Sequence, residues 1–381
     1  MSLATTEPNT AILVSLDFGT GDYTESTEEL RLLAESAGVQ VLAIVQGKRQ
    51  RPDAATFAGS GKVEELAAMV EELEAPLVIF NHDLSPAQMR NLSAQLQTRV
   101  IDRTMLILDI FALRAQSHEG KVQVELAQLK YLSTRLAGMN TDMGQQKNAV
   151  GARGPGETQL ELDRRKLDRR VHLLNERLKQ LRRHRELQRK ARNRSEVFSV
   201  SIVGYTNAGK STLFNRLTNA SVYAADQLFA TLDTTSRKIF LPGNDIARQV
   251  VLSDTVGFIR HLPHGLVAAF RGTLEETARA DLLLHVVDIN NPARDEQIAE
   301  VNKVLHEIDA QDVPQILVFN KIDMAGEQAA VQRDEYGKIN RIYLSAKSGA
   351  GLEEFRSALA ELRDEPDIVA APKAWHPLDD A

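Results

Sequence analysis

The sequence predicts an α/β protein in three parts: a small N-terminal α/β domain over residues 1–115, a helical hairpin of coiled-coil type over 116–196, and a second α/β domain over 197–364. In the first part, short apolar runs alternate with amphipathic stretches. Leucines recur at heptad spacing in the second part, and in the third a strand runs into a glycine-rich turn and a helix. Residues 365–381 form a tail with three prolines and the single tryptophan, Trp375.

In the N-terminal domain, apolar runs and amphipathic stretches predict strands and helices in an order typical of a largely parallel sheet. The strands are Ile12–Phe18, Val39–Val45 and Leu77–Phe80, and the helices are Glu28–Ala37, Val63–Leu73 and Ser85–Leu96. Gly38 is a suitable helix stop, and Ser85 before Pro86 is a favourable helix start. The segment Gly59–Lys62 resembles half of a phosphate loop, but it lacks the first glycine at the proper spacing. We interpret it as a plain turn into the helix that starts at Val63.

The middle part predicts two helices joined by a long loop. Val122–Leu136 has a helical pattern, and later leucines and a valine are spaced four, three, four and three residues apart. This heptad seam consists of Leu167, Val171, Leu174, Leu178 and Leu181. Because the repeat is short, we expect an intramolecular hairpin rather than a long coiled-coil dimer. Gly138–Thr158 is too rich in glycine for a helix and predicts a loop, and long loops are often functional.

Composition and charge narrow the class of protein. The absence of cysteine excludes a disulfide framework, a thiolate metal site and a cysteine nucleophile, and it agrees with a cytoplasmic location. No apolar run is long enough to span a membrane. The net charge of −6 argues against general nucleic-acid affinity, but residues 161–196 hold fourteen Lys and Arg against six Asp and Glu. These residues carry a net charge of +8, and the rest of the chain carries −14. Such a local excess of positive charge predicts contact with a polyanion.

A phosphate-binding loop is predicted between the strand Val197–Val203 and the helix Ser211–Asn219. Its residues are Gly204, Tyr205, Thr206, Asn207, Ala208, Gly209, Lys210 and Ser211. The glycines let backbone N–H groups wrap the phosphates, Lys210 contacts the β- and γ-phosphates, and the Ser211 hydroxyl ligates Mg²⁺. The alternative is a glycine turn that merely closes a βα unit.

Three further motifs follow in the order that a nucleotide site requires. The strand Val250–Leu252 leads to Asp254, Thr255, Val256 and Gly257; the strand Ile316–Phe319 leads to Asn320, Lys321, Ile322 and Asp323; the third motif is Ser345, Ala346 and Lys347. Asp254 can reach Mg²⁺ through water, and the Gly257 N–H can sense the γ-phosphate. Asp323 can accept both guanine N1–H and the exocyclic amine, which adenine cannot offer, and the third motif brings a backbone N–H to the guanine oxygen. Together the motifs resemble the GTPase superfamily and predict GTP rather than ATP.

A polar segment between the first two motifs predicts the first switch. It contains Phe229, Ala230, Thr231, Leu232 and Asp233. One threonine must complete the Mg²⁺ shell, and spacing alone does not separate Thr231 from Thr234 or Thr235.

The position after Gly257, where many GTPases carry a water-orienting glutamine, is Phe258. Phenylalanine cannot hydrogen-bond water, so we expect slow unassisted hydrolysis and a partner that completes the site. Charge stabilisation is left to Lys210, Mg²⁺ and the loop amides. Asn207 has two interpretations: it holds a K⁺ ion, as in a group of related GTPases, or it caps the loop's own backbone.

The run Gly151–Arg165, which includes GPGETQLELDRR, the basic helix after it, and Asp254–Arg260 resemble the HflX family of translational GTPases. The resemblance extends over nearly the whole chain. In this family the first switch contains FATLD, found here at Phe229–Asp233, so the resemblance favours Thr231 as the Mg²⁺ ligand. The catalytic assignment is therefore Lys210, Thr231 and Gly257. The resemblance implies a factor that binds the large ribosomal subunit, is stimulated by it in GTP hydrolysis, and separates stalled ribosomes under stress.

The basic part of the chain supplies candidates for contact with ribosomal RNA. These are Arg153, Arg164, Arg165, Arg169 and Arg170. Alternatively, the basic run is a solvated helix face, and Arg153 packs against the nucleotide domain. We expect a monomer that binds GTP and GDP. Two rival functions stay open: a GTPase of RNA or tRNA modification, and a nucleotide-switched RNA-binding protein with negligible turnover.

Overall fold

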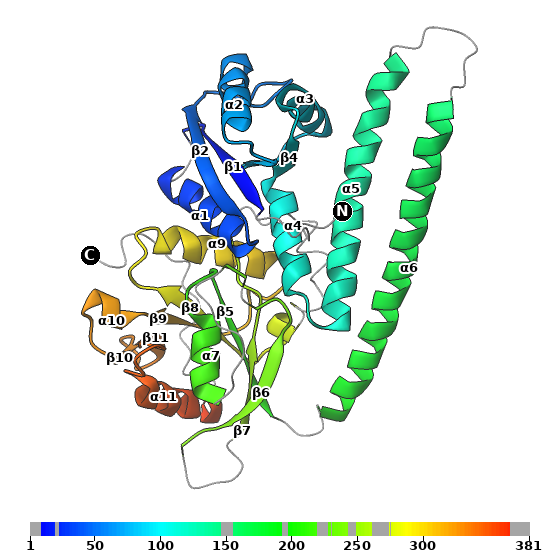
Figure 1. The fold of residues 1–381 in the computed structure, drawn as a ribbon. Coiled ribbons are helices and arrows are strands. Elements are labelled where there is room, and N and C mark those ends of the chain that lie inside the picture. The colour runs from blue at the N-terminus through cyan, green and yellow to red at the C-terminus, as the bar shows by residue number, and fades with distance from the viewer. Residues whose placement is uncertain are drawn as a thin grey trace. The chain divides into compact units, whose positions relative to one another are not determined.

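The computed structural model describes residues 9–19, 23–145, 155–192, 197–218, 228–229, 231–242, 249–260, 274 and 276–365. The chain forms two compact units, Met1–Leu181 and Arg182–Ala381 (Figure 1). The separation of a hairpin domain from the N-terminal domain stays a prediction. Arg153, Ala230 and Trp375 lie outside the described residues. Within the described ranges, no helix combines the length and apolar character needed to cross a membrane.

The first unit contains a four-stranded sheet in the order β2-β1-β3-β4, and all its strands are parallel, as the sequence predicts. The strands are β1 Thr10–Asp17, β2 Gln40–Lys48, β3 Leu77–Phe80 and β4 Arg99–Asp102. The central strands β1 and β3 are buried almost throughout. Such continuous apolar strands are typical of a parallel sheet covered on both faces. Strand β4 was not predicted, because only Val100 and Ile101 of its four residues are apolar, whereas all four residues of β3 are.

Four helices accompany this sheet: α1 Tyr23–Ser36, α2 Ser60–Glu72, α3 Pro86–Leu96 and α4 Arg103–Arg114. Helix α3 begins with a capping box, in which Ser85 Oγ accepts from Gln88 N at 3.2 Å and Gln88 Oε1 accepts from Ser85 N at 2.9 Å. Helix α4 was not predicted, because it is buried almost all round and lacks an amphipathic period.

The start of α2 differs from the prediction. The helix begins at Ser60 rather than Val63, so the segment read as a plain turn forms the first helical turn. Gly59 precedes it with φ 84°, a left-handed conformation that favours glycine. Lys62 Nζ lies 2.7 Å from Glu65 Oε2 on the same helix, an i,i+3 pair that helix geometry brings together.

Two long helices, α5 His118–Gln145 and α6 Pro155–Arg192, follow the sheet. Val122 and Leu126 of α5 pack against Leu174 and Leu178 of α6 in one buried cluster. Leu129, Val171 and Leu181 are partly buried against the same cluster, and Leu167 is half-buried. The heptad seam therefore closes an intramolecular helix pair, as predicted.

The loop predicted over Gly138–Thr158 was wrong at both ends. Helix α5 continues through Gly138 to Gln145, and α6 already begins at Pro155. An established helix gains a hydrogen bond with each added residue, whereas one internal glycine costs only about 1 kcal/mol. Proline is favoured at the first helical position, where its missing N–H would be unsatisfied anyway. Residues 146–154 lie outside the described ranges.

The second unit is built on a seven-stranded sheet in the order β10-β11-β9-β8-β5-β7-β6. The strands are β5 Phe198–Gly204, β6 Thr235–Phe240, β7 Gln249–Asp254, β8 Leu282–Asp288, β9 Gln315–Asn320, β10 Ala330–Arg333 and β11 Ile339–Tyr343. The outer pairs β6–β7 and β10–β11 are antiparallel, and the inner pairs are parallel. This is the mainly parallel sheet that the sequence predicts.

In the described part of this unit, the helices that follow β5 include α7 Lys210–Thr218, α9 Arg294–Glu307, α10 Ile322–Ala325 and α11 Leu352–Asp364. Apolar residues of α7 and α11 share one large core with the strands, whereas Ile298 of α9 packs with Val287 and Phe319 in a separate cluster. Residues 287 and 319 alternate with core positions along their strands, so α9 covers the opposite face. Loops at the carboxyl ends of β5, β7, β9 and β11 carry all four predicted nucleotide motifs, and this edge is where doubly wound sheets bind ligands.

Candidate nucleotide-binding site

The phosphate loop links β5 to α7, and two of its glycines are required by close contacts. At Gly204, with φ 146°, a Cβ atom would lie 2.3 Å from the carbonyl oxygen of Val286. At Gly209, with φ 94°, a Cβ would lie 2.1 Å from Asn320 Nδ2. Neither contact leaves room for a side chain. Asn207 between them also has a left-handed backbone, with φ 61° and an exposed side chain.

Lys210 begins helix α7 and is buried, and its Nζ donates to the Tyr205 carbonyl oxygen at 2.6 Å. Burial lowers the pKa of Lys210 to about 8, while the nearby Asp254 carboxylate acts in the opposite direction. The amine thus lies folded against the loop at the N-terminus of a helix, a position suited to phosphate.

Three oxygen-bearing side chains meet beside this helix. The Ser211 Oγ lies 2.7 Å from Thr231 Oγ1 and 2.7 Å from Asp254 Oδ2, and Thr231 Oγ1 lies 3.0 Å from the same carboxylate oxygen. The structure thus brings Thr231 to Ser211, whereas Thr235 lies within β6. Burial raises the pKa of Asp254, opposed by the Ser211 hydrogen bond and the Lys210 charge.

This oxygen cluster fits Mg²⁺, which prefers hard oxygen ligands and usually keeps water and phosphate in its shell. Asp254 Oδ1 is buried without a hydrogen-bond partner, so one carboxylate oxygen is available to a further ligand. No group of three or more His, Cys, Asp or Glu side chains suited to a metal occurs in the described part of the chain. A site of two hydroxyls and one carboxylate is one that a nucleotide would complete.

The segment after Asp254 runs along the phosphate loop. Thr255 Oγ1 donates to the Ile202 carbonyl oxygen at 2.6 Å, and a Cβ on Gly257 would lie 2.7 Å from Thr206 Cγ2. Phe258 pairs with the loop through two backbone bonds, Thr206 N to Phe258 O at 2.8 Å and Phe258 N to Gly204 O at 3.2 Å. The Phe258 side chain is 1% exposed and does not line the cavity, so it is turned into the core.

Hydrogen bonds of Asn320 connect the predicted base motifs to the phosphate loop. Asn320 Nδ2 donates to the Ala208 carbonyl oxygen at 2.8 Å, and Asn320 Oδ1 accepts from Ala346 N at 2.9 Å. The backbone N–H of Ala346 is therefore already bonded to Asn320. The buried Ser345 accepts from Ser348 N at 3.0 Å, which shapes the same turn.

Two residues that the sequence reasoning did not single out hold Lys321 in place. Asp288 Oδ2 lies 2.7 Å from Lys321 Nζ, and Asn290 Nδ2 donates to the Lys321 carbonyl oxygen at 3.0 Å. Asp288 is the last residue of β8 and Asn290 follows that strand, and Lys321 has a left-handed backbone with φ 67°. An acidic residue at the end of a buried strand that faces the predicted site was the signal that could have found them.

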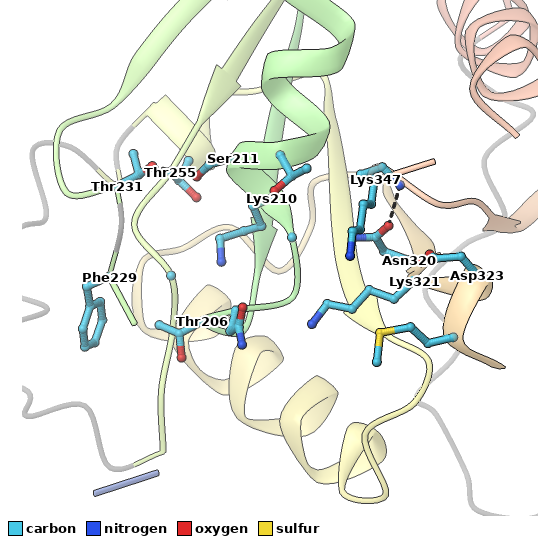
Figure 2. A pocket seen from close by; sticks show the side chains of 16 residues that line it. Thr206, Lys210, Ser211, Phe229, Thr231, Thr255, Asn320, Lys321, Asp323 and Lys347 are labelled. Carbon is cyan, nitrogen blue, oxygen red and sulfur yellow. Dashed lines mark hydrogen bonds between the residues drawn. The ribbon is translucent and has the colours of Figure 1, made fainter. Parts of the chain in front are cut away.

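A cavity of about 320 Å³ joins the phosphate and base ends of the site. Figure 2 shows Lys210, Ser211 and Thr231 toward one end and Asn320, Lys321 and Asp323 toward the other. The predicted residues that line it are Thr206, Asn207, Gly209, Lys210, Ser211, Phe229, Thr231, Thr255, Gly257, Asn320, Lys321, Asp323, Ala346 and Lys347. Thr212 and Met324 also line it and were not predicted.

The other described residues of the prediction stand outside the cavity lining. They are Gly204, Tyr205, Ala208, Leu232, Asp233, Asp254, Val256, Phe258, Ile322 and Ser345. Most are buried and support the lining residues through the backbone or the core.

The described candidates for RNA contact lie on α6. Arg164, Arg165 and Arg169 are exposed there. Arg170 is also exposed, but it pairs with Glu125 of α5 at 2.6 Å. The first three therefore offer the more accessible charges for a polyanion.

This site is that of a P-loop GTPase. A glycine-rich loop and a buried lysine stand at the phosphate end with the oxygen cluster, and Asn320 links that loop to the base motifs. Residues 24–112, 114–192 and 199–321 match families described as GTP-binding GTPase N-terminal, GTP-binding GTPase Middle Region and 50S ribosome-binding GTPase. GTPase HflX of Escherichia coli is 52% identical over 354 residues, which cover 92% of this chain and 82% of that protein. The chain belongs to the HflX family of GTPases.

Two further comparisons agree with this family. GTPase HflX of Caldanaerobacter subterraneus is 47% identical over 361 residues, covering 94% of this chain and 82% of that protein. The crystal structure of SsGBP in complex with GDP has a TM-score of 0.52 and 27% identity, and the match covers 94% of this chain and 99% of that one. The resemblance drawn from the sequence motifs is thus confirmed.

Proposed function

We propose that this GTPase is a cytoplasmic, monomeric factor that binds the large ribosomal subunit and separates or rescues stalled ribosomes under stress. The observation that carries the proposal is the exposed basic face of α6, with Arg164, Arg165 and Arg169, in the same chain as a GTPase site that lacks a water-orienting glutamine. Arginines on a helix suit the phosphates of ribosomal RNA. The match of residues 199–321 to a family described as 50S ribosome-binding supports the choice of partner.

The same proposal assigns roles within the site. Ser211 and Thr231 would hold Mg²⁺ directly and Asp254 through water, and the ion would offset charge that develops on the phosphates. Lys210 and the loop amides stabilise the same charge from the protein side. Asp323 lies exposed at the base end of the cavity, where its carboxylate would read guanine.

We expect the ribosome to stimulate hydrolysis because of the position of the Phe258 side chain. Its ring is buried and has no hydrogen-bonding group, so Phe258 cannot orient the attacking water. Large-subunit RNA or protein would order the switch segments or supply the missing group. GTP binding would stabilise the splitting conformation, and hydrolysis would then release the factor.

The decisive experiment is GTP turnover by the protein alone, with small subunits and with large subunits. Strong stimulation by large subunits supports the proposal. If neither ribosomal particle changes turnover, the ribosomal role is rejected, and tRNA becomes the partner to test.

Potassium dependence is a separate question that Asn207 raises. Its side chain is exposed and lines the cavity, so it is open to an ion bound there. Turnover should then be faster in K⁺ than in Na⁺ at equal ionic strength. Equal rates would remove K⁺ from the proposal.

A further inference from the structure

Thr206 carries a buried hydroxyl that the assigned roles do not use. The residue is 6% exposed, and its Oγ1 is buried without a hydrogen-bond partner. Its backbone N–H, in contrast, is satisfied by the Phe258 carbonyl oxygen. An unpaired buried hydroxyl is costly, so it requires an explanation.

The Thr206 side chain lies beside Gly257, at the end of the site where the γ-phosphate is expected. A Cβ placed on Gly257 would meet Thr206 Cγ2 at 2.7 Å and Lys210 Nζ at 3.0 Å. The side chain therefore lies next to the residue expected to sense the γ-phosphate and near the amine expected to bind it. It also lines the nucleotide cavity.

Figure 2 shows the Thr206 oxygen directed away from Lys210. The hydroxyl and the methyl group share one Cβ, so a rotation of about 120° about χ1 moves one staggered rotamer to the next. One of the two possible rotations places the hydroxyl oxygen where Cγ2 now lies, beside Gly257. No protein hydrogen bond of Oγ1 has to break for that rotation.

Neighbouring hydroxyls are engaged elsewhere. Thr255 Oγ1 bonds to the Ile202 carbonyl oxygen, and Tyr205 Oη accepts from Arg260 N at 2.7 Å. Ser211 and Thr231 belong to the oxygen cluster around Asp254. Thr206 is therefore the described hydroxyl at this end of the cavity that is both buried and without a protein partner.

We propose that Thr206 is a catalytic residue whose hydroxyl accepts a hydrogen bond from the water that attacks the γ-phosphate of GTP. In that reaction the water oxygen forms a bond to the γ-phosphorus, and the bond from this phosphorus to the β–γ bridging oxygen breaks with its electron pair left on GDP. The water protons pass to the released phosphate and solvent. A threonine hydroxyl is too weak a base to take a proton, so it orients the water.

This role of Thr206 belongs to the GTPase reaction itself and does not depend on the proposed ribosomal role. Its test is therefore single-turnover hydrolysis by the full chain without ribosomes. Thr206→Val removes the hydroxyl at nearly constant shape, and Thr206→Ser keeps it. We expect the valine variant to hydrolyse bound GTP roughly tenfold more slowly, and the serine variant to stay within about threefold of the wild type.

Nucleotide affinity distinguishes a catalytic role of Thr206 from a role in nucleotide binding or in packing of the loop. GDP and a non-hydrolysable GTP analogue should bind both variants as tightly as they bind the wild type. A wild-type rate in the valine variant would overturn the proposal. It would also be overturned by an equal loss of GDP affinity in both variants, which indicates loop packing, or by weaker analogue binding with an unchanged rate, which indicates a ground-state contact.

Discussion

Single residues at the phosphate loop set the geometry of the nucleotide site. At Gly209 there is no room for a side chain beside Asn320, whose amide also bonds to the Ala208 carbonyl oxygen. Asn320 in turn accepts from Ala346 N. One glycine therefore lets the phosphate end and the base end of the site join through a single side chain.

Gly209→Ala should weaken GDP and GTP binding by a factor of ten or more, as an order-of-magnitude estimate for a strained backbone with a displaced hydrogen-bond partner. The added Cβ would lie 2.1 Å from Asn320 Nδ2, so either the loop or Asn320 must move. Isothermal titration with GDP would measure the change.

Gly61→Ala is the matched control for that substitution. Gly61 lies in α2, and a Cβ there would meet nothing within 4 Å. Alanine has the higher helix propensity, so this variant should be as stable as the wild type or slightly more so. Unchanged GDP affinity in Gly209→Ala would contradict the packing argument.

Asp254 supports a second prediction at this scale, concerning metal. Asp254→Asn keeps the shape but removes the charge beside Ser211 and Thr231, so the Mg²⁺ concentration for half-maximal hydrolysis should rise roughly tenfold to a hundredfold. A magnesium titration of turnover tests this. Asp281→Asn, whose carboxylate accepts only from Ser199 among the hydrogen bonds seen here, should leave the magnesium requirement unchanged.

Local motifs allowed most of the site to be predicted, because the residue types and spacings that wrap phosphates are short-range properties of the chain. The role of Phe258 was only half predictable. Its inability to bind water follows from its chemistry, but its burial follows from the pairing of its backbone with Gly204 and Thr206. The support of Lys321 by Asp288 and Asn290 also depends on which loops meet in space.

Secondary-structure elements were predicted where the periodicity was strong. The strands around β1 and β3 and the helix after Ser85 follow from apolar runs and from capping chemistry. The failures have physical reasons as well. Helix α4 is buried on nearly all sides, and α5 and α6 extend past glycines that a local reading takes as breaks.

The contact between α5 and α6 gives a prediction for one element. Leu174 is 0% exposed in the seam, so Leu174→Ala should lower the free energy of unfolding of the first unit by about 2–5 kcal/mol. Urea unfolding followed by circular dichroism measures this. The adjacent Leu173 is 51% exposed, and Leu173→Ala should cost little. Equal effects of the two substitutions would rule out the assigned seam.

At the scale of the whole molecule, charge is concentrated rather than spread. The chain carries −6 overall, yet residues 161–196 carry +8. Repulsion from the acidic body would discourage general binding to nucleic acid, while the basic stretch favours one site of contact. This arrangement suits the proposed contact with RNA in one orientation.

Replacing Arg164, Arg165 and Arg169 together by Gln should weaken binding to large subunits in the GTP-like state. Each lost phosphate contact should also reduce the slope of log affinity against log salt by about 0.7–0.9. Co-sedimentation at several salt concentrations provides both values. Arg170→Gln is the comparison variant, because Arg170 is already paired with Glu125.

The triple variant should still hydrolyse GTP at the basal rate, because none of its residues lines the nucleotide cavity. Unchanged binding and an unchanged salt slope in the triple variant would show that these three arginines do not make the proposed contact with the ribosome. A loss confined to Arg170→Gln would point instead to the helix pair as the element that matters.

Strand β8 has a consequence for the timing of nucleotide release. Its residues Leu282–Val287 are all buried between β5 and β9, so their amides can exchange hydrogen with solvent only when most of the sheet opens. Such opening approaches global unfolding and is rare. We therefore expect nucleotide release to require rearrangement only of the loops at the strand ends, so that the β8 amides keep a deuterium label through many rounds of GTP turnover.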